Sequence, residues 1–590
     1  MDDPIVAVGL IVGGTAIVVA FVLQGAAVTT AWATGHPTPG PGPSALRIVL
    51  DPARPWRAYG SRPFGPVWVF WSLAALYAAL AAVVVAQAVR LWRRLDTWGR
   101  PQVRGGIEDA VGVADRRTVK ESMSGRAMTG RAAQLRPSAA GSGARLGATD
   151  VAFQVGRARG VEVFVSVEDS VVVLGPPRSG KGLHLVIPAI LDAPGAVVTT
   201  STRPDNLAVT FNARQRVGPV AVFDPQRLAG GVPSAVRWSP LRGCEDMAIA
   251  MARARTLVTS TQDVKGGGYW GERARQVLQA LLHAAALGGV STSTLYRWTV
   301  SEALARAEAL AILEQSPRAA AGAAESLGQT LDLHEETRGS IWSIVAGSLA
   351  PLGDPGVMAA LSPSAGEAFD PQAFLAERST LFLLGTGSGA SSTERIVSAL
   401  VEDVTMTAQR VAAASRGQRL DPPLSLVLDE AANYPLPSLP ELMSAGGGSG
   451  IWTMAVLQSL AQARDRWGEA KTQEIWDSAI AKIVLGGQGN AKDLREMSDL
   501  IGVFEDVVFT EQHSSGSSWS TSATTREVAI LTPGQIRQMR FGTGLLLPRA
   551  VAPVALELRR WTQRADGKVL ADDRNAMETV LGDHARAGAR

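Results

Sequence analysis

The segment Val171-Val-Val-Leu-Gly-Pro-Pro-Arg-Ser-Gly-Lys-Gly-Leu-His-Leu-Val-Ile-Pro188 joins an apolar run, a glycine-bounded turn and a second apolar run. The β-branched run Val171–Leu174 predicts a buried strand, and the residues after Gly182 predict a helix. A glycine-rich turn between a strand and a helix is the setting in which main-chain N–H groups surround phosphate. An ordinary glycine-rich turn is the alternative, and the flanking strand and helix disfavour it.

The residue types in this turn suit a nucleotide phosphate. Gly175 and Gly180 permit backbone angles closed to other residues and let N–H groups approach an anion. Lys181 can reach the β- and γ-phosphates, and the helix dipole adds to this attraction. Gly182 departs from the general pattern, in which Ser or Thr offers a hydroxyl to Mg²⁺. We predict that ATP contacts Gly175, Pro176, Pro177, Arg178, Ser179, Gly180, Lys181, Gly182 and Leu183.

A second apolar strand, Leu424–Leu428, ends in two carboxylates. Asp429 can hold Mg²⁺ through water, and Glu430 can polarise the water that attacks the γ-phosphate. The next apolar strand ends at Gln458, which can sense the γ-phosphate or act only as a polar strand cap. We predict Asp429 and Glu430 as metal ligands, and Lys181, Glu430 and Gln458 as catalytic residues.

These strands predict an α/β fold, a P-loop nucleotide-binding domain with an additional-strand ATPase core. Its first part covers 151–245 and its second part 366–560, separated by an all-α domain at 246–365 in which the strand pattern disappears. Aromatic residues of the helical part could stack on bases, although such residues more often belong to a core. The Ser/Thr/Gly tract Thr510–Arg526 predicts a mobile loop, and residues 561–590 form a charged tail.

Residues 1–100 predict a membrane anchor. Ile5–Leu23 and Val67–Val89 are uncharged and about long enough to cross a bilayer. Trp residues flank the second run, as interfacial anchors do. The acidic start at Met1-Asp-Asp3 disfavours a signal peptide. Five arginines follow the second run, although the loop between the runs also carries four. We expect a two-span hairpin with the ATPase domain in the cytoplasm.

Residues 101–150 predict a basic linker. Its most basic part, Asp115–Arg136, could form a helix that touches anionic lipid or nucleic acid. A solvated linker helix is an equally good interpretation of the same charges. The sequence leaves this choice open.

Composition excludes several other classes. The chain has 590 residues, 46% of them hydrophobic, and a formal net charge of only +3, unlike a histone-like polycation. Its single cysteine, Cys244, rules out an internal disulfide or a four-thiolate zinc site. The six histidines show no HExxH spacing, and no G-x-S-x-G elbow occurs, so metalloprotease and serine-hydrolase functions lack support.

Taken together, the motifs resemble the TraG/TraD family of type IV secretion coupling proteins, which are relatives of the FtsK and HerA motor ATPases. The resemblance covers roughly residues 1–560, and glycine at position 182 is common in this family. The motifs that carry it are Gly-Pro-Pro-Arg-Ser-Gly-Lys-Gly (175–182), Val-Ile-Pro (186–188), Thr-Ser-Thr-Arg-Pro-Asp-Asn-Leu (200–207), Val-Phe-Asp-Pro (222–225), Leu-Asp-Glu-Ala-Ala-Asn (428–433), Val-Leu-Gln-Ser-Leu-Ala-Gln (456–462) and Arg-Trp-Gly (466–468).

The resemblance implies a multi-pass protein of the bacterial inner membrane that forms a homo-hexameric ring. The ring uses ATP and Mg²⁺ to recruit single-stranded DNA with its relaxase and to drive it into the type IV secretion channel during conjugation. Lys181 would be the phosphate lysine, Asp429 and Glu430 the metal and catalytic carboxylates, and Gln458 the strand-end sensor. The resemblance also implies that the P-loop nucleotide-binding domain is RecA-like, with the all-α domain inserted in it. The helical domain would receive the substrate.

One departure from the family's motors leaves an alternative open. Such motors often carry a trans-acting arginine finger shortly before the strand that ends at Gln458, but Ala445–Gly450 contains no arginine. Arg464 and Arg466 are the nearest candidates and follow the strand. The alternative is a receptor that binds ATP and hands protein cargo to a channel without being a DNA motor. A double-strand DNA pump is disfavoured by the helical interruption.

Overall fold

The computed structural model describes residues 4–39, 48, 51–59, 65–96, 107–141, 143, 145–233, 235–258, 267–364, 366–386, 392–513 and 519–588, and every structural statement below concerns these residues. They divide into two compact units, Met1–Arg104 and Gly105–Arg590. Each unit has its own packed core, and each is described by itself.

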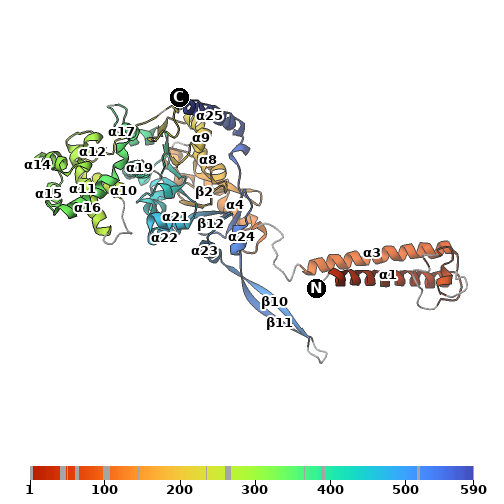
Figure 1. Cartoon of the computed structure of the whole chain (residues 1–590). Helices are drawn as coiled ribbons and strands as arrows, with labels where there is room; N and C mark the ends of the chain where they lie inside the picture. Colours follow the sequence, from red (N-terminus) through yellow and green to blue (C-terminus); the bar gives the residue numbers. More distant parts are fainter. Residues whose placement is uncertain are drawn as a thin grey trace. The chain divides into compact units, whose positions relative to one another are not determined.

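The first unit is a pair of long helices, α1 (Pro4–Ala33) and α3 (Val67–Asp96), with the short 3-10 helix η1 (Pro55–Tyr59) between them (Figure 1). Buried side chains such as Ala27 and Phe70 pack the two helices together. Within the described part of the chain, one helical stretch, Val67–Gln87, is long enough and apolar enough to span a membrane. Ile5–Leu23 lies within α1, but most of its side chains fall outside the described residues, so the two-span hairpin stays a prediction.

The second unit is built on an eleven-stranded sheet in the order β2-β1-β13-β12-β9-β3-β8-β7-β4-β6-β5. Neighbours from β9 to β5 are parallel, and the strands from β2 to β12 add antiparallel pairs. The strands are β1 (Ala152–Ala158), β2 (Val161–Ser166), β3 (Val171–Leu174), β4 (Val197–Ser201), β5 (Val220–Phe223), β6 (Thr380–Leu384), β7 (Leu424–Leu428), β8 (Ile451–Leu457), β9 (Ala481–Leu485), β12 (Thr543–Pro548) and β13 (Val554–Glu557).

The phosphate-loop strand β3 shows why the sheet forms here. Val172 and Leu174 contact one core cluster, and Val171 and Val173 contact another on the opposite face. A strand buried on both faces reads as a continuous β-branched run, because helices cover both sides of a parallel sheet. The apolar strands predicted from the sequence are therefore the central ones.

Helices cover both faces of the sheet, and many begin at a side-chain cap; Asp246, Ser459 and Asn490, for example, each accept a backbone N–H. The helical elements are η2 (Ile107–Asp109), α4 (Arg116–Met123), α5 (Gly125–Thr129), α6 (Ala132–Leu135), α7 (Pro137–Gly141), η3 (Ala148–Asp150), η4 (Gly182–Val186), α8 (Ile187–Asp192), α9 (Asp205–Gln215), α10 (Met247–Leu257), α11 (Gly267–Leu287), α12 (Thr292–Val300), α13 (Glu302–Leu304), η5 (Ala305–Leu310), α14 (Ala311–Gln315), α15 (Ala323–Leu331), α16 (Glu335–Ser348), η6 (Ala350–Gly353), α17 (Pro355–Ala360), α18 (Pro371–Ala376), α19 (Glu394–Ala414), η7 (Arg416–Gln418), η8 (Ala431–Asn433), α20 (Leu439–Ala445), η9 (Gly446–Ser449), α21 (Leu460–Trp467), α22 (Glu469–Ser478), α23 (Ala491–Ile501), α24 (Pro533–Arg537), η10 (Trp561–Gln563) and α25 (Gly567–Gly588).

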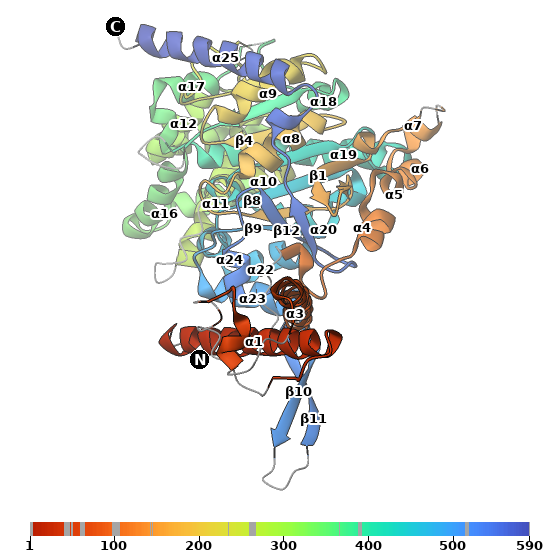
Figure 2. The same cartoon turned by 90° about the vertical axis from the view of Figure 1, so that its right-hand side faces the viewer.

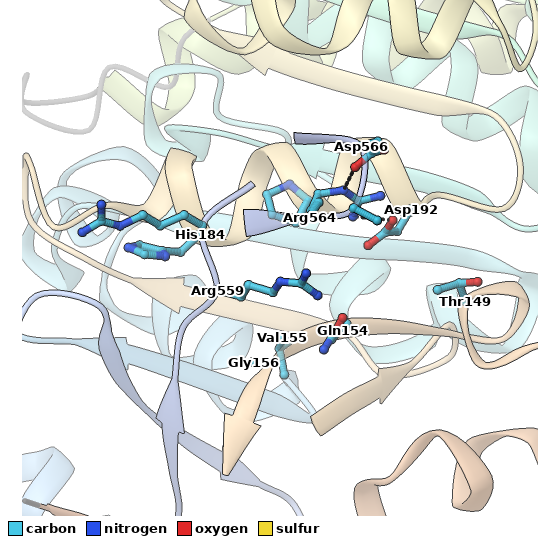
Figure 3. Close-up of a pocket in the computed structure, with 12 residues that line it drawn as sticks. Thr149, Gln154, Val155, Gly156, His184, Asp192, Arg559, Arg564 and Asp566 are labelled. Carbon is cyan, nitrogen blue, oxygen red and sulfur yellow. Dashed lines mark hydrogen bonds and ion pairs between the residues drawn. The ribbon is translucent and has the colours of Figure 1, made fainter. Parts of the chain in front are cut away.

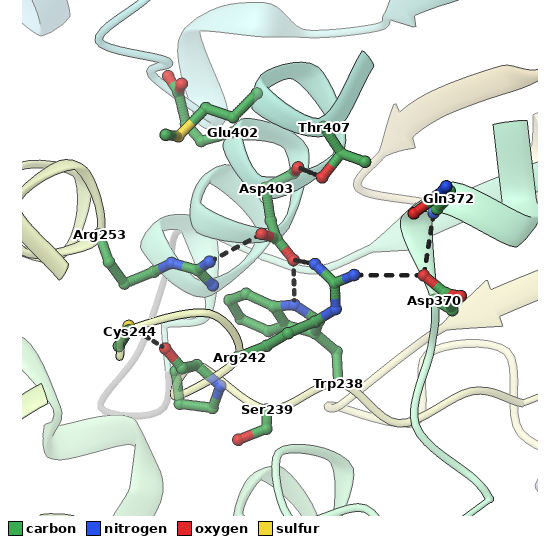
Figure 4. Close-up of polar contacts among 12 residues, drawn as sticks. Trp238, Ser239, Arg242, Cys244, Arg253, Asp370, Gln372, Glu402, Asp403 and Thr407 are labelled. Atoms are coloured by element: carbon green, nitrogen blue, oxygen red, sulfur yellow. Dashed lines mark hydrogen bonds and ion pairs between the residues drawn. The ribbon is translucent and has the colours of Figure 1, made fainter. Parts of the chain in front are cut away.

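The elements from α10 to α17 form the helical segment that interrupts the sheet, and they gather to one side of it (Figure 1). A buried polar cluster joins α10 of this segment to α19, which packs on the sheet (Figure 4). Asp403 on α19 accepts hydrogen bonds from Trp238 (3.0 Å), Arg253 (3.0 Å) and Arg242 (3.4 Å). The Arg253 and Asp403 side chains are each 2% exposed. We call these four residues the Asp403 cluster.

The prediction that Thr510–Arg526 is a mobile loop is wrong for the described part of this tract. Strands β10 (Val503–His513) and β11 (Trp519–Ala529) pair in register from Val503↔Ala529 to His513↔Trp519. The resulting ribbon projects from the sheet (Figure 1). Thr and other β-branched residues favour strands. Val503 and Val507 are exposed although they are apolar, so the hydrophobic pattern does not mark a core-facing side of the ribbon.

Two segments outside the predicted core domain pack onto it. The single basic helix predicted within Asp115–Arg136 is instead broken into α4, α5 and α6, of which α4 and α5 pack against β2 (Figure 2). The predicted charged tail contains α25, which lies along α9. This places part of the C-terminal segment beside the carboxyl edge of the parallel strands.

Candidate nucleotide-binding site

The candidate site forms where β3, β7 and β8 end. These strands are parallel, and β8 lies between β3 and β7. Leu174 pairs with Leu457, so the loop that starts at Gly175 and the side chain of Gln458 leave the same edge of the sheet. The carboxyl ends of the strands of open α/β sheets are where ligands bind. The structure thus brings the predicted site elements to one place.

The phosphate loop is held by close packing around Gly180. Its φ of +87° lies in the region that glycine favours, and a Cβ there would come within 2.8 Å of His184 and Phe541. Lys181 donates from Nζ to the Gly175 carbonyl at 3.3 Å, which folds its side chain back over the loop. The helix begins with a π-turn, η4, and continues as α8. Turns of this kind occur often at functional sites.

Glu430 is fixed by three hydrogen bonds from neighbouring side chains. Its carboxylate accepts from Thr202 (2.7 Å), Asn433 (2.9 Å) and Gln458 (3.2 Å). Its backbone has a φ of +53°, a conformation that is uncommon outside glycine and that costs free energy. All three donors are uncharged, so they orient the carboxylate without pairing it with a cation.

Asp429 lies deeper and has an unused acceptor. Asn206 donates to Oδ2 at 3.0 Å, whereas Oδ1 is buried and accepts no hydrogen bond among the described residues. Burial raises the pKa of Asp429 to about 6; the Asn206 hydrogen bond and the Lys181 charge lower it, and the Glu430 charge raises it. A buried oxygen without a partner calls for a ligand.

This donor set fits Mg²⁺ bound together with phosphates. Carboxylate oxygens suit the ion, which is commonly held by one or two carboxylates, phosphates and water. Among the described residues no group of three or more His, Cys, Asp or Glu side chains could hold a metal by itself. Asp429 Oδ1 is therefore the best-placed protein ligand, with Glu430 next to it.

A cavity of about 600 Å³ opens over these residues. Of the predicted site residues, it is lined by Arg178, Gly180, Lys181, Gly182, Leu183, Asp429 and Glu430. Gly175, Pro176, Pro177 and Ser179 belong to the loop but not to the lining, and Gln458 reaches the site through Glu430. The loop and the two carboxylates thus face one common space.

The structure adds residues to which the sequence assigned no role. Thr202, in the turn after β4, and Asn206, at the start of α9, hold the two carboxylates; a turn at a strand's carboxyl end was the available signal. Trp561 and Arg574 line the far wall of the cavity from the C-terminal segment. No local pattern points to them, because they approach the loop only through the packing of α25 on α9.

The two arginines nearest to the predicted finger position are engaged within the chain. Arg464 pairs with Asp493 at 2.9 Å, and Arg466 lies 3.7 Å from Glu394. The segment before β8 has little room for an arginine, since a Cβ at Gly447 would come within 2.0 Å of the Glu168 carbonyl. Close backbone packing explains Gly446, Gly447 and Gly450, whereas a Cβ at Gly448 would meet open space.

A second cavity of about 400 Å³ adjoins the same helix (Figure 3). His184, Pro188 and Asp192 line it from η4 and α8, and Gln154 lines it from β1. Arg564 closes one side through ion pairs with Asp192 and Asp566. Burial lowers the pKa of His184, the Arg559 backbone raises it and the Arg560 charge lowers it. The phosphate-loop helix thus has an open space on either side.

Comparison with known proteins supports the class suggested by this arrangement. Residues 423–541 match the family described as the TraM recognition site of TraD and TraG. The unbound bacterial conjugative coupling protein TrwB lacking its N-terminal segment (TrwBdeltaN70) is similar in fold, with a TM-score of 0.52, 19% identity, and coverage of 69% of this chain and 88% of that chain. No curated protein sequence matches this chain.

A second solved structure gives the same result. TrwB in complex with the non-hydrolysable ATP analogue ADPNP aligns with a TM-score of 0.51, 18% identity, and coverage of 69% of this chain and 90% of that chain. The second unit therefore has the α/β fold of conjugative coupling proteins, with a large mixed sheet. Together with the family match over residues 423–541, this makes the chain similar to TraG/TraD-type coupling proteins.

Proposed function

We propose that this chain is a membrane-anchored ATPase that moves single-stranded DNA with its relaxase into a type IV secretion channel. The observation that carries the proposal is the hydrogen-bonded group of Glu430, Thr202, Asn433 and Gln458 beside Asp429 and the phosphate loop. A site that only bound nucleotide would not need a carboxylate oriented by three donors. The fold shared with TrwB, which has been seen with ADPNP, supports ATP as the ligand.

Binding of ATP follows from charge and backbone placement. Lys181 would leave the Gly175 carbonyl, a single neutral acceptor, for the more negative phosphates. The N–H groups at the start of η4 point along the helix axis towards the same anion. Asp429 and Glu430 would hold Mg²⁺, which neutralises charge on the phosphate oxygens when it is bound. The neutral partner Asn206 leaves Asp429 free to carry its charge to that ion.

Glu430 would act as the base for the attacking water. Hydrogen bonds from Thr202, Asn433 and Gln458 set the direction of its two oxygens, and the proton of the water would pass to one of them. Gln458 joins the end of β8 to this carboxylate, so the state of the γ-phosphate can be passed to the strand. Movement of β8 would in turn reach α21, which begins at Ser459.

The remaining features of the proposal concern assembly. The motif resemblance favours a homo-hexamer at the bacterial inner membrane, with the second unit in the cytoplasm and both N-terminal helices spanning the bilayer. The family that matches residues 423–541 is named for TraM recognition, which favours a partner of the DNA-processing complex on this part of the chain. Channel proteins of the secretion system would be the next partners.

The test is ATP hydrolysis by the detergent-solubilised full chain, with and without single-stranded DNA. We expect DNA to stimulate turnover and Glu430→Gln to lower it by about 10²–10⁴-fold, the usual contribution of a general base, while ATP binding is kept. Lys181→Ala should lose binding as well as turnover. Asp477→Asn, an exposed acidic residue outside the cavity, is the matched control and should behave as the wild type.

Other outcomes would count against the proposal. Unchanged turnover in Glu430→Gln would remove this residue from the mechanism. Tight ATP binding with no turnover under any condition would favour the receptor that hands over protein cargo. Normal DNA transfer in cells by Lys181→Ala, with normal membrane insertion, would also contradict the proposal, because the nucleotide site would then not be needed for transport.

A further inference from the structure

A groove on the outer side of α4 and α5 carries a concentration of positive charge. It has a volume of about 1000 Å³ and is open to solvent. Its basic lining residues are all exposed, and they are Arg116, Arg117, Lys120 and Arg126. The lining also includes small and apolar residues such as Ala127 and Val161, which form a floor between the charges. We call this surface the basic groove.

The charge of the basic groove is mostly uncompensated. Glu121, the one acidic lining residue, pairs with Arg117 at 2.9 Å. In the described part of the chain, Arg116, Lys120 and Arg126 form no ion pair. An exposed helix turn normally intersperses both signs of charge. The groove is therefore a site for an anion rather than a solvated salt-bridge surface.

Packing keeps these side chains on the outside. Val119, Met123 and Met128 are buried and join the core that contains β1 and β2. Asp115 caps α4 by accepting the Thr118 N–H at 2.8 Å, which fixes the start of the helix. Residues 116 and 120 are one turn apart and lie on the same face. The structure thus presents a preformed basic surface.

Its position in the chain suggests the anion. Arg116 follows Asp96, the end of α3, by 20 residues, and α3 contains the apolar stretch Val67–Gln87. A fully extended chain of 20 residues spans at most about 70 Å, so a membrane-inserted α3 keeps the groove within reach of the lipid surface. Basic clusters just cytoplasmic of a span bind anionic lipid headgroups.

We propose that the basic groove binds the headgroups of anionic phospholipids and holds the second unit against the membrane. The proposal rests on the membrane anchoring in the proposed function. Charge alone would also suit nucleic acid, but the apolar floor suits the glycerol region of a lipid, and the tether favours an occupant that is always nearby. Contact with the bilayer would orient the ATPase without any change in its nucleotide site.

A fluorescent label can test this contact in the full chain. Gly130 is exposed, has an ordinary helical φ of −59°, and a Cβ there would meet only ordinary contacts, so Gly130→Cys suits labelling. The native Cys244 is buried and would not compete. The labelled protein is placed in nanodiscs of phosphatidylcholine alone or with phosphatidylglycerol, each containing a headgroup-attached quencher. A label at Glu336→Cys on α16 reports background quenching.

We expect about threefold more quenching at position 130 in anionic discs than in neutral discs, and no such difference at position 336. Arg116→Glu with Lys120→Glu should bring the ratio at position 130 to about one, and so should 1 M salt, where screening acts within about 3 Å. Arg318→Glu with Lys471→Glu makes the same charge change at exposed sites outside the groove and should leave the ratio unchanged.

Three results would overturn the proposal. The first is equal quenching in the two disc types, and the second is a ratio that survives the charge reversal in the groove. The third is protection of the label by single-stranded DNA with no effect of lipid charge, which would make the groove a nucleic-acid surface. Co-elution of protein with discs is measured in parallel, so a failure of membrane anchoring is distinguished from a failure of the groove.

Discussion

Two aspartates in this molecule lie in opposite environments. Asp403, between α19 and the helical segment, is surrounded by the positive charges of Arg253 and Arg242 and by the indole N–H of Trp238. Asp429, at the end of β7, accepts a hydrogen bond from the neutral Asn206 on one oxygen and, among the described residues, none on the other. The Asp403 side chain is 2% exposed, whereas Asp429 is partly exposed and lines the nucleotide cavity. Within the described part of the chain, Asp403 forms ion pairs with arginines and Asp429 forms none.

This difference distinguishes a buried contact that holds two elements together from a carboxylate that can bind a ligand. A buried carboxylate with cationic and hydrogen-bonding partners fixes two elements together. A carboxylate with an open oxygen and a raised pKa remains ready for a ligand that brings its own positive charge. The same substitution, aspartate to asparagine, should therefore have opposite consequences at the two positions.

The largest effect is expected for Asp403→Asn. This change keeps the shape but leaves Arg253, whose side chain is 2% exposed, without a countercharge. Removing one partner of a buried pair costs about 3–5 kcal/mol of unfolding free energy. Denaturant titration of the solubilised protein measures it. Asp370→Asn, which touches Arg242 from an exposed position, should cost no more than about 1 kcal/mol, and an equal loss in both variants would contradict the comparison.

At the other aspartate, Asp429→Asn should reduce ATP hydrolysis by 10²-fold or more while stabilising the fold at neutral pH. The pKa of Asp429 is about 6 in the folded chain and about 3.9 when unfolded, so its ionised form opposes folding above pH 6. The gain in stability, about 1–3 kcal/mol, should be complete above pH 6 and vanish as the pH falls to 4. Thermal melts of both proteins from pH 4 to pH 7 provide the measurement.

A smaller effect is expected when the orientation of Glu430 is disturbed. Thr202→Val removes the donor at 2.7 Å and keeps the side-chain shape. Loss of one hydrogen bond to a charged group is worth about 1.5–3 kcal/mol, so kcat should fall by about 10- to 100-fold with little change in nucleotide affinity. Thr202→Ser keeps the hydroxyl and should restore turnover. Equal activity in the valine and serine variants would show that Thr202 does not position Glu430.

The smallest effect concerns the access of solvent to the Asp403 cluster. Cys244 lies beside the Asp403 cluster (Figure 4), and burial raises its pKa to about 11. It should be unreactive towards thiol reagents at pH 8 in the folded chain and react on unfolding, because the thiolate is the reactive form. A colorimetric thiol assay follows the rate. Asp403→Asn should speed the reaction, whereas Asp429→Asn should not.

The sequence predicts the parts of the site that depend on local pattern. The runs before Gly175, Asp429 and Gln458 are apolar on both faces, and parallel strands deliver their ends to one edge. The hydrogen-bond partners of these residues could not be predicted from local pattern. Asn206 meets Asp429 across 223 positions of sequence, and only the packing of the start of α9 beside the end of β7 creates that contact.

Two further features show why other parts escaped prediction. Trp561 and Arg574 reach the cavity because α25 packs on α9, and a helix's packing partner is not encoded in its own periodicity. In the β10–β11 ribbon, apolar residues such as Val503 and Val507 are exposed, so the hydrophobic pattern does not mark a core-facing side by which a strand could be recognised. Both cases depend on tertiary placement rather than on the local residues.

The order in which the eleven strands pair has a consequence for the synthesis of the chain. Arg157 of β1 pairs with Glu557 of β13, 400 residues later. Strand β3 likewise pairs with β8 and β9, which are synthesised long after it. At about 5–20 residues per second, a ribosome needs about 20–80 s to bring the last of these strands out after the first. During that interval β1 to β3 have edges whose partners are not yet made, and unpaired strand edges are templates for pairing with other chains. The long separation of paired strands therefore prolongs the exposure of the nascent chain to aggregation.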